Sequence, residues 1–77
     1  MEMKKMNLYI IHDVLYDYTA GMVVIAASSL ERCRELFEEE FGSHMKEYDD
    51  AVKNNSYSVY QVVDEEEGVK DYVYGGS

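Results

Sequence analysis

Hydrophobic and polar positions along the chain predict four short strands around a helical middle. Residues 7–12 and 22–27 (NLYIIH and MVVIAA) are β-rich runs, and the segment between them carries Asp17 and Gly21, which suit a hairpin connection. Residues 56–63 (SYSVYQVV) alternate as a strand does, and residues 69–74 follow a charged turn at 64–68 and can return as a last strand. Two strands are therefore expected before the helical region and two after it.

The most regular pattern is a helix that begins at Ser28. Ser28 and Glu31 match a capping box, in which the Ser28 hydroxyl accepts from the Glu31 amide and the Glu31 carboxylate reaches back to the Ser28 amide. Gly42 stands where a residue with positive φ commonly closes a helix. Residues 45–52 fit either a second short helix ended by Asn54 and Asn55 or an irregular acidic loop. The apolar positions at helical spacing are Leu30, Cys33, Leu36, Phe37 and Phe41.

The element order ββα(α)ββ predicts an α+β fold, with a small antiparallel sheet and one main helix on one face. A β-grasp-like variant, with the first and last strands adjacent, is the alternative arrangement. The 77 residues form one expected domain, 1–77, which buries only about 60% of the surface of its unfolded chain. Residues 8–11 and 22–27 are nevertheless apolar on both strand faces. The second sheet face is therefore expected to meet a second copy, as a homodimer, or another protein.

Composition limits the compartment and the chemistry. The single cysteine, Cys33, excludes an internal disulfide, and its place on the apolar helix face predicts a small buried hydrophobe and not a nucleophile. His12 and Asp13 interrupt the first apolar run too early for a signal peptide or a membrane span. A cytoplasmic protein with no membrane association is expected.

The formal net charge of −9 lies entirely in the second half of the chain. Residues 1–34 hold four acids and four bases, whereas residues 35–71 hold twelve acids against three lysines. In the predicted helix Arg32 and Arg34 come early and residues 38–40 (EEE) come last, which opposes the helix dipole. A solvated face that keeps the protein soluble is one interpretation of the acids, and a surface for a basic partner is the other.

Catalytic and metal sites are weakly indicated. His44 with Asp49 and Asp50 could bind a divalent cation, but the spacing matches no HExxH, Cys/His or EF-hand pattern. No Gly-rich phosphate loop follows a strand, so no enzyme and no cofactor is expected. Direct nucleic-acid binding is disfavoured, because phosphate contacts need clustered lysine and arginine.

The expected function is that of a small acidic protein-binding module. Carboxylates spaced along a helix and turn can imitate phosphates and compete for a basic, nucleic-acid-binding groove. Tyrosines supply contact area at low entropic cost. The candidate partner-binding residues are Glu35, Glu38, Glu39, Glu40, Glu47, Asp49, Asp50, Tyr16, Tyr18 and Tyr48.

Two resemblances bear on this expectation. NLYIIHDV, a tyrosine-bearing loop and VVIAASSLERCREL, within residues 7–41, resemble the strand-loop-strand-helix opening of short phage-encoded proteins, some of them anti-CRISPR or other anti-defence proteins. That resemblance implies a stoichiometric viral inhibitor of a host nucleoprotein complex and carries over no catalytic residue. The ending Tyr74-Gly75-Gly76-Ser77 is similar to that of ubiquitin-like and sulfur-carrier proteins, which present a C-terminal Gly-Gly once a residue such as Ser77 is removed.

Overall fold

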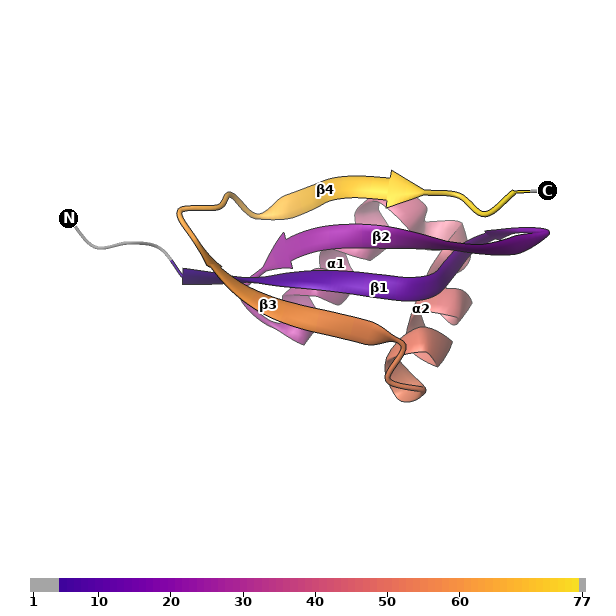
Figure 1. Cartoon of the computed structure of the whole chain (residues 1–77), viewed down its shortest axis with the longest axis horizontal. Helices are drawn as coiled ribbons and strands as arrows, with labels where there is room; N and C mark the ends of the chain where they lie inside the picture. The colour runs from indigo at the N-terminus through magenta and orange to yellow at the C-terminus, as the bar shows by residue number, and fades with distance from the viewer. Residues whose placement is uncertain (1–4, 77) are drawn as a thin grey trace.

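A long hairpin forms the centre of the sheet in the computed structural model, which describes residues 5–76 (Figure 1). β1 (Lys5–Asp17) pairs antiparallel with β2 (Thr19–Ala27). The two predicted strands are confirmed, but most of the predicted loop between them is also strand. Two register shifts between His12 and Asp17 let the pairing continue to the hairpin tip at Tyr18, which has a φ of 69°.

Two helices follow the hairpin. α1 (Leu30–Phe41) starts one residue later than the capping box predicted, because the Ser29 hydroxyl is the cap and accepts from the Arg32 N–H at 3.1 Å. Gly42 does not close α1 with a positive φ: its φ is −55°, and the chain continues through a 3₁₀ turn, η1 (Gly42–His44). α2 (Met45–Lys53) then forms, so the helical alternative for residues 45–52 is confirmed.

The last two strands lie on opposite edges of the sheet. β3 (Tyr57–Val63) pairs with β1, β4 (Gly68–Val73) pairs with β2, and the strand order is β3-β1-β2-β4. The β-grasp-like arrangement is therefore wrong, because β1 and β4 are not neighbours. Residues 64–67 form no tight turn but cross three strand spacings, about 14 Å, which five Cα steps reach only when nearly extended.

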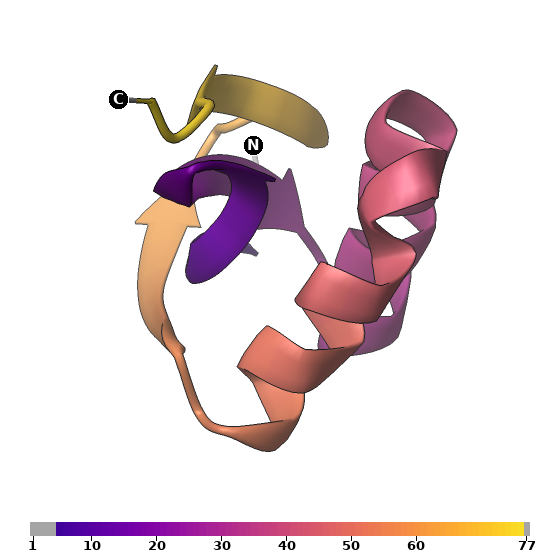
Figure 2. The ribbon, with the colours of Figure 1, turned by 90° about the vertical axis from the view of Figure 1, so that its right-hand side faces the viewer.

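Both helices cover one face of the sheet, as the view down the long axis shows (Figure 2). The predicted α+β fold, an antiparallel sheet with helix on one face, is confirmed. The core lies between the two layers and includes Ile11, Val23, Ile25, Phe37 and Tyr48, all fully or almost fully buried. Neither helix in residues 5–76 is long and apolar enough to cross a membrane.

No described helix covers the opposite face of the sheet (Figure 2), and the residues that the strand pairing places there are mostly apolar. Alternation along the paired strands places every second residue there, and several of these side chains are half-buried or exposed. This open face contains Leu8, Ile10, Met22, Val24, Tyr60, Val62 and Val73. The sequence correctly predicted strands that are apolar on both sides.

Candidate functional site

Several of the candidate acids are held in ion pairs. Arg34 makes a two-pronged contact with the Asp49 carboxylate, at 2.9 Å from Nε and 3.1 Å from a terminal nitrogen, and so ties α1 to α2. This guanidinium lowers the pKa of Asp49 below its ordinary value. Glu35 lies 3.1 Å from Arg32, and the Lys46 ammonium lies 2.9 Å from Asp50.

Tyr48 is not a surface anchor, and its prediction as a binding residue is wrong. Only 1% of the residue is exposed, because it occupies the apolar face of α2 and stacks on Phe37 with ring centres 4.9 Å apart. Burial is the main cause that raises its pKa. Tyr18, in contrast, is 91% exposed at the hairpin tip, and it is not among the residues that line the hollow described below. Tyr48 therefore belongs to the core, whereas Tyr18 lies on the surface.

The candidate metal set does not assemble. His44 Nδ1 lies 2.9 Å from Glu47, while Asp49 contacts Arg34 and Asp50 contacts Lys46. Within residues 5–76 no group of three or more histidine, cysteine or acidic side chains is placed to hold a metal ion. Burial also raises the pKa of the Cys33 thiol, which disfavours the reactive thiolate.

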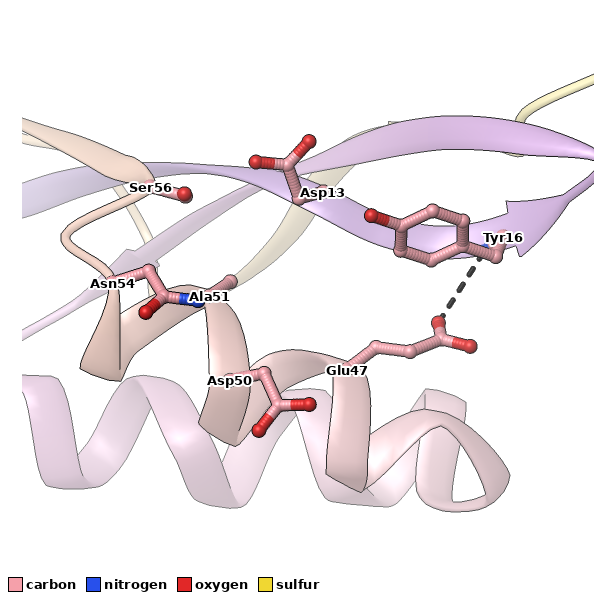
Figure 3. Close-up of a pocket in the computed structure, with 7 residues that line it drawn as sticks. All are labelled: Asp13, Tyr16, Glu47, Asp50, Ala51, Asn54 and Ser56. Atoms are coloured by element: carbon pink, nitrogen blue, oxygen red, sulfur yellow. Dashed lines mark hydrogen bonds between the residues drawn. The ribbon is translucent and has the colours of Figure 1, made fainter.

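Three of the candidates line one hollow between β1 and α2 (Figure 3). Tyr16 forms part of one wall, Glu47 and Asp50 stand on the facing helix, and the hollow measures about 340 Å³. The Tyr16 N–H donates to the Glu47 carboxylate at 3.3 Å, which joins the two walls. This acidic hollow is lined by Asp13, Tyr16, Glu47, Asp50, Ala51, Asn54 and Ser56.

Irregular strand geometry brings β1 into this arrangement. Asp13 and Leu15 have φ values of 61° and 54°, a left-handed conformation that aspartate tolerates better than most residues. The distortion lets the adjacent residues Val14 and Leu15 both be fully buried, whereas a regular strand would point one of them to solvent. Asp13 borders the hollow, and its exposed carboxylate points away from α2 (Figure 3).

Asp13, Asn54 and Ser56 line the hollow but are not among the binding residues that the sequence predicts. In the sequence Asp13 interrupts an apolar run, Asn54 ends the possible second helix, and Ser56 begins a predicted strand. An aspartate at the end of a strongly apolar β run can mark a bulge, and that was the available signal. No local pattern places residues 13–16 beside residues 47–56, since only the packing of α2 on β1 does so.

The hollow is lined by carboxylate, hydroxyl and amide groups. Its three carboxylates come from two segments more than thirty residues apart in sequence. Carboxylates in this setting suit charge-assisted hydrogen bonds from a guanidinium or ammonium group. The arrangement can therefore receive a basic side chain.

A second acidic surface lies at the end of α1. Glu38, Glu39 and Glu40 are exposed, and among the described residues they form no ion pair. The last turn of α1 contains no basic residue, so these charges face the negative end of the helix dipole without compensation. Helix stability does not explain this triplet.

The Gly-Gly segment is docked on the hairpin and not extended. The Gly75 N–H donates to the Leu15 carbonyl at 3.0 Å, and the Gly76 N–H donates to the Thr19 hydroxyl at 2.9 Å. Gly75 is buried against Thr19, and a Cβ there would overlap the Thr19 carbonyl. This docking and the strand order differ from a carrier protein with a free glycine tail; Ser77 lies outside the described residues.

No family model matches the chain, and no curated protein or solved structure shows significant similarity to it.

Proposed function

We propose that this chain is a non-enzymatic protein-binding module whose acidic hollow receives a basic side chain of a partner. The observation that supports this proposal is that Asp13, Glu47, Asp50 and Tyr16 line one hollow. Tyrosine beside carboxylates is a composition suited to arginine, because the ring can stack on a guanidinium plane while the acids accept its hydrogen bonds.

The charges around the hollow leave it able to accept a cation. Lys46 contacts Asp50, but its side chain is 90% exposed and can turn into solvent when another base arrives. Glu47 is held by the Tyr16 N–H and by His44, so one carboxylate is already oriented. Among the described residues Asp13 forms no ion pair, and its exposed carboxylate can turn toward an arriving base.

The proposed target is a basic surface that normally contacts nucleic-acid phosphates. Such surfaces gather lysine and arginine, and a partner with a net charge of −9 competes for them by charge. The resemblance to phage-encoded anti-defence proteins makes a host nucleoprotein complex the target class, and the module its stoichiometric inhibitor in the host cytoplasm. The Glu38–Glu40 triplet steers the approach, because charges outside the contact mainly change the association rate.

The test is capture from a nuclease-treated bacterial lysate on immobilised parent and on the double variant Asp13→Asn with Asp50→Asn. Asparagine tolerates the positive φ of Asp13, so the backbone is retained. The matched control is Asp64→Asn with Glu66→Gln, which removes two charges outside the hollow. Asp64 has a positive φ, as Asp13 does, so both double variants replace one aspartate in that conformation.

Immobilised parent and control variant are both expected to capture at least one protein from the lysate, and added double-stranded DNA is expected to displace that protein. The hollow variant is expected to retain about tenfold less of it, because a basic side chain loses charge-assisted bonds. Equal retention of the same proteins by parent and hollow variant would refute the role of the hollow.

A further inference from the structure

The two edges of the sheet are protected very differently. β3, at one edge, is the seven-residue run YSVYQVV, with no charged residue, no proline, no glycine and an unbroken register against β1. Natural edge strands usually avoid pairing with other chains by means of charges, proline, bulges or shortness. None of these devices is present in β3, although the chain as a whole carries sixteen acids.

β4, at the other edge, has several of these devices. It contains Lys70 and Asp71, starts at a glycine, and shows a register shift against β2 between Val24 and Ile25. The Tyr72 N–H is already bonded to the Asp71 carboxylate at 2.8 Å, so a backbone donor of this edge is occupied within the strand itself. β4 is therefore blocked, and β3 is the edge that can accept another strand.

The outward backbone groups of β3 follow from its hydrogen bonds to β1. The His12 N–H donates to the Ser56 carbonyl at 2.8 Å, which marks a bonded pair at the start of the ladder. Bonded and non-bonded pairs alternate in an antiparallel ladder. Ser58, Tyr60 and Val62 therefore bond toward β1. The residues whose N–H and C=O groups point away from the sheet are Tyr57, Val59, Gln61 and Val63.

We propose that β3 pairs antiparallel with β3 of a second copy of this chain, which joins the two four-stranded sheets into one of eight strands. A two-fold axis at Tyr60 pairs all seven residues of each strand with the other. It sets Val59 against Gln61 of the second copy, and Tyr57 against Val63. The four outward residues then become the bonded pairs of the new ladder.

Charge and apolar exposure favour a second copy as the occupant of this edge. A strand of the same protein brings no acid, so the net charge of −9 on each copy causes no close repulsion along the ladder. Asp64, just beyond β3, falls opposite the neutral Ser56 in this register. Pairing would also cover Val59, Tyr60 and Val63, which are about half exposed. Because β4 is blocked, the assembly closes as a dimer and does not extend into a fibre.

The test compares Val59→Lys on β3 with Val73→Lys on β4, two valines of 46% and 56% exposure on opposite edges. Both variants change the net charge equally. Because Val73 also lies on the open face, Val73→Lys additionally tests for a contact through that face. Sedimentation from micromolar to millimolar concentration is expected to show a dimer for the parent. The dissociation constant should rise at least about tenfold in Val59→Lys, because a lysine on an edge strand opposes pairing, and less than about twofold in Val73→Lys.

Hydrogen exchange in the unmutated protein supplies a second readout that does not depend on a variant folding. On concentration, the Tyr57, Val59 and Gln61 amides should exchange at least about tenfold more slowly, while the Ser58 and Tyr60 amides change little. A parent that stays monomeric, or a dimer that Val73→Lys dissociates and Val59→Lys does not, would overturn the proposal. A monomeric parent would indicate that β3 pairs instead with an extended segment of another protein. A dimer that only Val73→Lys dissociates would place the contact between copies on the open face.

Discussion

At the scale of single residues, the packing of the two helices decides which acid Arg34 contacts. Glu38 lies one helical turn after Arg34 in α1, but Arg34 contacts Asp49 of α2 through two hydrogen bonds. Helical spacing makes only the i,i+4 neighbour visible in the sequence, whereas the observed partner comes from the antiparallel packing of α2 on α1. The pair therefore links two elements and does not stabilise one helix alone.

Replacement of Asp49 by asparagine should destabilise the fold by about 0.5 kcal/mol at neutral pH, a small effect because both side chains are half exposed. The pKa of Asp49 is lowered in the folded state, so its stabilisation is present above the unfolded pKa of about 4 and is lost as the pH falls through the folded pKa. Urea unfolding should show the stabilities of parent and variant converging as the pH falls through the folded pKa. A stability difference that does not shrink with falling pH would contradict the assignment.

Cys33 should resist alkylation in the native protein, because its side chain is buried and burial raises the pKa of its thiol. Iodoacetamide labelling followed by mass spectrometry should be slow in buffer and fast in urea. Labelling at the same rate in both conditions would show that Cys33 is accessible.

At the scale of the elements, the sequence predicted the strands and helices well and their ends and neighbours less well. Alternation and helical spacing fix which segments are β or α, since burial on one side imposes those periods. The cap moved from Ser28 to Ser29 because either hydroxyl could serve, and Gly42 kept a helical φ because α2 follows directly. The order β3-β1-β2-β4 has no local signature, and neither does the presence of Asp13 and Asp50 around one hollow.

The two docked glycines permit a matched test of the C-terminal segment. Gly75→Ala should destabilise the protein by about 1 to 2 kcal/mol, because a Cβ at Gly75 overlaps Thr19 and forces the segment off the hairpin. Gly76→Ala is the control, since a Cβ there meets nothing within 4 Å. Thermal unfolding and exchange of the Gly75 amide should separate the two variants. Equal behaviour would mean that this segment does not dock as described.

At the scale of the whole molecule, charge and apolar surface are segregated. Of the twelve acids in residues 35–71, all except Asp71 lie on the helices or on the connection between β3 and β4. The open face and the edge strand β3 are almost free of charge. One molecule can therefore offer an acidic side to a basic partner and a neutral edge to its own copy.

The Glu38–Glu40 triplet tests whether surface charge serves binding at the expense of stability. Changing all three residues to glutamine should raise the unfolding free energy by at most about 1 kcal/mol, because it removes charge from the negative end of the α1 dipole. Association with a captured partner should become slower and less dependent on salt. An unchanged salt dependence would make the triplet an ordinary solvated face.

The most direct test of the proposed binding role is site-specific photo-crosslinking in a nuclease-treated bacterial lysate. A benzoylphenylalanine replaces Asn54 at the rim of the hollow or, as the control, Glu66 on the connection between β3 and β4. We expect crosslinks from position 54 alone, to peptides rich in lysine and arginine, and we expect double-stranded DNA to suppress them. Crosslinks that are the same from both positions, or that DNA leaves unchanged, would contradict an acidic hollow built for a basic nucleic-acid-binding surface.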